Sequence, residues 1–186
     1  PSKVGSFLIW QQPHLIYLAE LLYRANPSEE LLKKYNSLIQ ETAEFMYSFA
    51  TYEEEHDRYV LKGAIPAQET LRAAETVNPP FELSYWHFAM QVAQTWRERT
   101  RMERVPEWDV LIEKLSPLAY NDEQLYLAAE TAVDTYKDIR FTSDHMAVLG
   151  AVGILPMNQL IHAGYMKNTL HWIWDNWNWN KTWGWE

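Results

Sequence analysis

Residues 13–49 read PHLIYLAELLYRANPSEELLKKYNSLIQETAEFMYSF, and this stretch decides the fold class. Apolar residues up to position 25 recur at intervals of three and four, which predicts a helix with a broad apolar stripe. Asn26-Pro27-Ser28-Glu29 then predicts a new helix, with the asparagine as N-cap and the proline in the first helical position. The second helix is apolar on one side and mostly charged on the other. The stretch therefore predicts a helical hairpin.

The same spacing continues through most of the chain. Residues 81–102 predict a long helix that Asn78 caps, with Trp86 and Trp96 on its apolar, core-facing stripe. Further helices are predicted over residues 106–115, over residues 144–155 behind a Ser143 cap, and over residues 162–176. Residues 121–136 are ambiguous, and 125–128 could form a short strand. With no linker in residues 1–186, we expect one all-α domain of six or seven helices, largely antiparallel hairpins.

Residues 51–80 interrupt this pattern. The segment has an acidic run at Glu53-Glu54-Glu55, a glycine at position 63, and the prolines of Asn78-Pro79-Pro80. We interpret the acidic run as a solvated turn. Because a long, non-helical segment inside a helical domain is more often functional or disordered than idle, it is the first place to look for a site.

Composition excludes several classes of protein. The chain has 16 Lys and Arg against 25 Asp and Glu, a net charge of -9, so a nucleic-acid partner is not expected. Its longest apolar run, residues 147–155, is too short for a membrane span. There is no cysteine for a disulfide framework, and the six histidines lack the paired spacing of a zinc site, so no metal and no cofactor are expected.

Tryptophan is the unusual feature: the chain has ten, and six lie in the last fifteen residues. Sugar-binding clefts combine indole rings, on which pyranose C–H faces stack, with carboxylates, amides and imidazoles for the hydroxyls. Such residues stand at helix starts and in loops, where they can converge at one end of a bundle. The candidate binding residues are Trp10, Gln11, His14, Gln68, Asn78, Asp144, His145, Trp179, Trp183 and Trp185.

Two nearby motifs resemble a known family. Ile65-Pro66-Ala67-Gln68-Glu69-Thr70, followed by Val77-Asn78-Pro79-Pro80-Phe81-Glu82-Leu83-Ser84-Tyr85-Trp86, is similar to a segment of the six-hairpin, (α/α)6-toroid glycosidases, particularly glycoside hydrolase family 65 and its bacterial relatives. The resemblance implies an all-α fold of (α/α)-toroid type, and it makes Glu69 the general acid of a glycoside hydrolase. A complete toroid needs twelve helices, so the chain would be a partial (α/α)6 barrel: a fragment of a longer catalytic domain, a shortened relative, or a half-barrel that another chain or a second copy completes.

An inverting glycosidase pairs such an acid with a carboxylate that activates water, and a phosphorylase would use phosphate instead. Glu186, Asp144, Glu82 and Glu75 are candidates for the second carboxylate, with Glu186 preferred because the tryptophans precede it. We expect Glu69 to be buried among aromatic rings, as a proton donor requires. The partner would be an oligosaccharide or polysaccharide, which suggests a periplasmic or extracellular setting.

Purely structural roles for the candidate residues also stay open. Glu69 and Glu82 could be ordinary loop and helix-dipole acids, Asp144 could belong to a helix cap, and His145 could be a hydrogen-bonded core residue. The terminal tryptophans could seal the bundle instead of stacking on sugar. The alternative function is therefore a non-catalytic helical module that binds a glycan or a partner protein.

Overall fold

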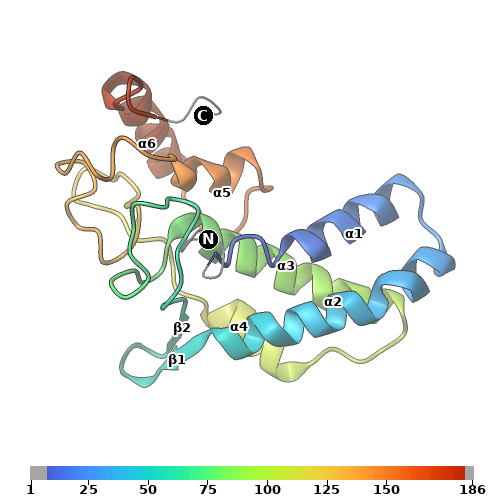
Figure 1. Ribbon diagram of the computed structural model, residues 1–186. Helices are drawn as coiled ribbons and strands as arrows, with labels where there is room; N and C mark the ends of the chain where they lie inside the picture. Colours follow the sequence, from blue (N-terminus) through green and yellow to red (C-terminus); the bar gives the residue numbers. More distant parts are fainter. Residues whose placement is uncertain (1–7, 183–186) are drawn as a thin grey trace, which may run out of the picture.

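The computed structural model describes residues 8–182, and within them the chain forms six α-helices, two short 3-10 helices and one two-stranded sheet (Figure 1). The all-α prediction is confirmed at this level. Nowhere in this described part is a helix both long enough and apolar enough to cross a membrane.

The helical hairpin is formed by α1 (His14–Ala25) and α2 (Glu29–Phe49), which lie side by side (Figure 1). The predicted cap was wrong by two residues: Asn26 ends α1, and Ser28 caps α2 by accepting a hydrogen bond from the Leu31 amide at 3.2 Å. Ser28 has the extended backbone that lets a hydroxyl reach the third amide of a helix. The sequence pattern therefore predicted the boundary between the two helices correctly, but it did not predict which residue caps α2.

Helix α3 (Pro80–Arg99) runs through the centre of the molecule and is buried on nearly all sides. Both of its tryptophans have no exposed surface, which confirms their predicted place in the core. Each also has a partner for its indole N–H: Trp86 donates to the Met46 carbonyl at 2.9 Å, and Trp96 donates to Glu20 Oε2 at 2.8 Å. Satisfying these donors lets two large rings occupy the core without an unpaired polar group.

The segment after α2 is less irregular than expected, because it begins with a hairpin of β1 (Thr51–Glu53) and β2 (Arg58–Val60). The acidic run forms the turn as a short 3-10 helix (Glu54–His56), and Asp57 takes a left-handed conformation with φ of 49°. Aspartate tolerates this conformation better than most residues. Beyond β2, no helix forms until α3.

The second half contains less helix than predicted. Helix α4 (Pro106–Lys114) and helix α6 (Ala163–Asn176) lie where expected. Residues 144–155 instead contain a 3-10 turn (Ala147–Leu149) and a one-turn α5 (Gly150–Gly153). The predicted cap at Ser143 is wrong, since its hydroxyl donates to the Ile139 carbonyl. Residues 125–128 form no strand, only an isolated bridge between Tyr126 and Tyr120.

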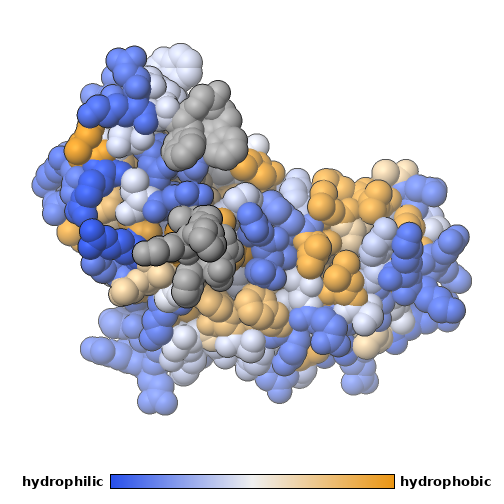
Figure 2. Space-filling view, in the orientation of Figure 1, coloured by the Kyte–Doolittle hydropathy of each residue, from blue (hydrophilic) through white to orange (hydrophobic). Residues whose placement is uncertain are grey.

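The apolar stripe of α1 is only half covered. Ile16 and Ala19 are buried, whereas an apolar patch on the outer face of the helix is open to solvent (Figure 2). This α1 patch, exposed by 43 to 57%, consists of Leu15, Leu18, Leu21 and Leu22.

Candidate functional site

A cavity of about 630 Å³ gathers four of the predicted site residues: Trp10, His14, Glu69 and His145. They come from three segments that are far apart in the sequence. An isolated β-bridge between Leu8 and Ile65 holds the first two segments together. The rest of the wall is mostly apolar and is formed by Ala67, Phe81, Met146, Ala147, Leu149, Gly150, Gly153 and Ile154.

One side of the cavity is an aromatic and imidazole cluster at the start of α1. Trp10 meets the His14 ring edge to face with centroids 5.2 Å apart, and His14 Nδ1 lies 2.5 Å from the hydroxyl of Tyr85. Burial lowers the pKa of His14 and raises the pKa of Tyr85, so a neutral imidazole and a protonated phenol share this hydrogen bond. Because Nδ1 is engaged by Tyr85, Nε2 is the ring atom through which His14 would meet a sugar hydroxyl.

The loop that carries Glu69 is anchored on both sides of this residue. Two residues before it, the Ala67 amide donates to Glu82 Oε1 at 2.6 Å; one residue after it, the Thr70 amide donates to Asp144 Oδ2 at 2.7 Å. Both acceptor carboxylates are buried. Glu69 itself is exposed at the cavity, so the expected burial among aromatic rings is wrong for the described residues. Hydrogen bonds therefore hold the backbone on both sides of Glu69, while the side chain of Glu69 is accessible to a ligand.

Gln68 and Asp144, predicted to bind substrate, are placed behind the cavity wall. Gln68 is 2% exposed and donates from Nε2 to the Phe141 carbonyl at 3.0 Å. Asp144 is 3% exposed, and its backbone carbonyl accepts a hydrogen bond from the Trp177 indole. Its side-chain Oδ1 lies 3.9 Å from Nε2 of His145, a residue that does line the cavity. Neither side chain is in the cavity wall, and both hold the loops that form it.

Glu82 is a buried acid, and its burial was not predicted from the sequence. It has no exposed surface, and burial raises its pKa to about 7, against the opposing effect of the Ala67 amide. Its second oxygen, Oε2, has no hydrogen-bond partner among the described residues. In the sequence, Glu82 stands between Phe81 and Leu83, and both of these residues are buried. Such apolar neighbours were the signal that Glu82 itself could be buried, which the helix-dipole interpretation did not use.

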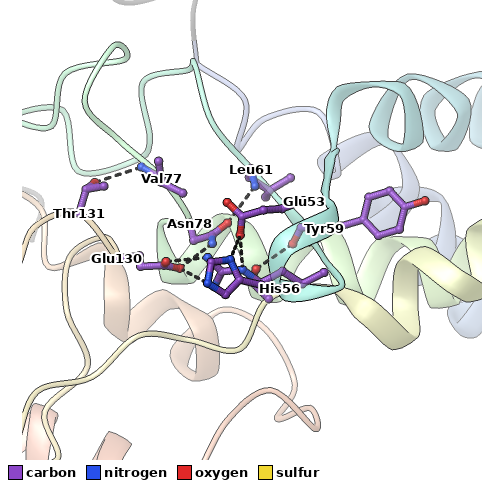
Figure 3. Close-up of polar contacts among 10 residues, drawn as sticks. Glu53, His56, Tyr59, Leu61, Val77, Asn78, Glu130 and Thr131 are labelled. Atoms are coloured by element: carbon purple, nitrogen blue, oxygen red, sulfur yellow. Dashed lines mark hydrogen bonds and ion pairs between the residues drawn. The ribbon is translucent and has the colours of Figure 1, made fainter.

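Asn78 belongs to a separate polar network that joins the β-hairpin to the start of α3 (Figure 3). Its Oδ1 accepts from the Leu61 amide at 2.9 Å, and its Nδ2 donates to Glu130 Oε2 at 2.7 Å. Glu130 also accepts two hydrogen bonds from Arg58, at 2.8 and 3.0 Å. Asn78 has a φ of 53° and does not cap α3, since Pro79 precedes the helix and makes no side-chain cap. Both ends of its side-chain amide are therefore hydrogen-bonded inside the fold.

The other predicted residues lie away from the cavity or cannot be placed. Gln11 is exposed in the turn before α1. Trp179 is 43% exposed and packs edge to face on Trp174, with centroids 6.3 Å apart, rather than lining the cavity. Trp183, Trp185 and Glu186 lie outside the described residues. Between residues 8 and 182, no three His, Asp or Glu side chains are grouped so as to hold a metal ion.

No protein-family model matches this chain, and no curated protein has a significantly similar sequence. The resemblance to six-hairpin glycosidases therefore rests on the motifs alone.

Proposed function

We propose that the chain contributes the saccharide-binding wall and the general acid of an inverting glycoside hydrolase. The observation that carries this proposal is the shared cavity of Trp10, His14, Glu69 and His145. Its volume of about 630 Å³ falls in the range typical of small-molecule sites, about 300–1,000 Å³.

Each group has a role that follows from its chemistry. The indole of Trp10 offers a flat face to the C–H side of a sugar ring, and His14 and His145 supply ring nitrogens for hydroxyl groups. Glu69 donates its proton to the glycosidic oxygen as the bond from that oxygen to the anomeric carbon breaks. A second carboxylate removes a proton from the water that attacks the anomeric carbon from the opposite face.

The exposure of Glu69 is compatible with this role when a ligand is bound. A sugar seated in the cavity would cover the carboxyl group and exclude water from the bond to be cleaved. For the second carboxylate we keep Glu186 as the proposal, on the sequence argument alone. Asp144 and Glu82 already accept backbone hydrogen bonds outside the cavity wall, and this favours a structural use for them.

The test is replacement of Glu69 by Gln, assayed as reducing-sugar release from disaccharides of both anomeric configurations, because their sugar leaving groups need protonation. We expect hydrolysis to fall at least about 100-fold, because general acid catalysis contributes factors of about 10² to 10⁴, while saccharide binding and unfolding stay close to wild type. Glu113→Gln, at an exposed acid on α4, is the control. Full turnover by Glu69→Gln would refute the role of this acid.

A non-catalytic glycan-binding module is the second candidate, favoured by the exposure of Glu69 and the largely apolar wall. Binding of oligosaccharides without any turnover, followed by tryptophan fluorescence, would support the module over the enzyme.

We also propose that the helical hairpins form part of an (α/α)6 toroid. The exposed α1 patch supports this, since a row of leucines on one helix face is typical of a surface that packs on further helices. The missing half would come from the same polypeptide or from a homodimer. Sedimentation of the present chain, with Leu18→Glu as the disrupting variant, separates the two sources: dimerisation that the variant abolishes supports the homodimer.

A further inference from the structure

We propose that the carboxylates of Glu82 and Asp144 hold the backbone on either side of Glu69 and thereby fix the position of this side chain at the cavity. The two residues are called the carboxylate clasp below. The inference rests on the proposed function of Glu69, and it makes Glu82 and Asp144 positioning residues.

The first support is the geometry of the contacts. The clasp accepts hydrogen bonds from the amides of Ala67 and Thr70, at 2.6 and 2.7 Å, so it brackets Glu69 within four consecutive residues. Both acceptor carboxyl groups are buried, and a hydrogen bond in such a low-dielectric setting is stronger than the same bond in water. A loop held at both positions has little freedom to move Glu69 relative to the cavity.

The second support is the origin of the two acids. Glu82 lies in the first turn of α3, next to Phe81 of the cavity wall, and Asp144 lies just before the 3-10 turn that also lines the cavity. The clasp therefore ties one loop to two elements that both form the cavity. Neither carboxylate is in the cavity wall itself: Glu82 acts on a ligand through the loop, and Asp144 acts through the loop and through the neighbouring His145.

The third support is the energetic cost of the arrangement. Glu82 has no exposed surface and keeps Oε2 without a partner among the described residues. A buried acid that is incompletely paired destabilises a fold, and an apolar residue of similar size would usually be more stable. Costly polar groups of this kind occur mainly at functional sites, where they hold a reacting group in place.

The test compares two substitutions at each acid: Glu82→Gln and Asp144→Asn, which keep a carbonyl acceptor, and Glu82→Leu and Asp144→Leu, which remove it. Hydrogen exchange of the Ala67 and Thr70 amides reports the clasp without any substrate. We expect exchange at the amide facing the substituted residue to become at least about tenfold faster in the leucine variants, with partial protection kept by Gln and Asn. Glu113→Gln, an exposed acid on α4, is the control.

Kinetics on the same disaccharides then test the positioning role. We expect the leucine variants to lower kcat about tenfold or more with little change in KM, and the Gln and Asn variants to recover most of the loss. Faster exchange without any loss of kcat would overturn the positioning role, and unchanged exchange would overturn the clasp. If a leucine variant does not fold, exchange in Glu82→Gln and Asp144→Asn decides: rates equal to wild type refute the proposal, and rates about threefold faster support it.

The proposed function can fail separately. In that case Glu69→Gln keeps its turnover, or wild type hydrolyses no glycoside, while the exchange results still report whether the clasp exists.

Discussion

Replacing Glu82 by Gln should make the protein more stable at neutral and alkaline pH, and the gain should depend on pH. Burial raises the pKa of Glu82 from 4.5 to about 7, so the folded state holds its proton over a range in which the unfolded state has lost it. The favourable contribution is fully present below the unfolded value and is lost as the pH rises through 4.5 toward about 7. This difference corresponds to about 3 kcal/mol. Gln is neutral at every pH and can still accept from the Ala67 amide.

The assay is urea unfolding of wild type and Glu82→Gln at about pH 5, 6, 7 and 8. We expect similar free energies of unfolding near pH 5 and an advantage for the variant that grows by about 2 to 3 kcal/mol toward pH 8. Other titrating groups cancel in the comparison because both proteins carry them. Glu113→Gln, an exposed acid, should show no such trend. Parallel curves for wild type and Glu82→Gln would refute the argument that Glu82 ionises inside the folded protein at a cost.

Substitutions at three further positions test other contacts. Glu20→Ala leaves the buried Trp96 indole and the Arg99 guanidinium without their acceptor, so urea unfolding should show a loss of about 3 kcal/mol; a loss below about 1 kcal/mol would contradict a buried pair. Asn78→Ala removes the acceptor of the Leu61 amide at a left-handed position, so thermal unfolding should show a loss of stability of about 2 to 4 kcal/mol. Unchanged stability together with weaker saccharide binding would instead show that Asn78 binds the ligand. Trp10→Ala should weaken saccharide binding about threefold to tenfold by calorimetry, and Trp10→Phe should recover part of it; equal affinities would show that the indole does not stack on sugar.

Much of the helical framework could be predicted because it depends on local patterns. The spacing in residues 13–49 and 81–102 repeats every three to four positions, and such a repeat has one stable solution for the backbone. Where the outcome depended on which polar group reaches which amide, prediction failed: Ser28 rather than Asn26 caps α2, and Ser143 caps nothing. These choices differ by a few tenths of a kcal/mol to about 1 kcal/mol, less than tertiary contacts supply.

The candidate site divides in the same way. Residue chemistry indicated Trp10, His14, Glu69 and His145, and the structure brings these four to one cavity. The same chemistry also selected Gln68, Asn78 and Asp144, whose polar groups are used within the fold. An amide or a carboxylate that holds a loop has the same composition as one that binds a sugar, so a list of residue types does not separate them.

By itself, therefore, the sequence determined the helical class, the long central helix and its buried tryptophans, since periodicity and side-chain size act over a few turns of chain. Only the tertiary structure decided that Glu69 is exposed, that Glu82 is buried with a raised pKa, and that backbone amides on both sides of Glu69 meet carboxylates from distant segments. Burial and hydrogen-bond partners depend on which segments pack together, and that is a property of the folded chain as a whole.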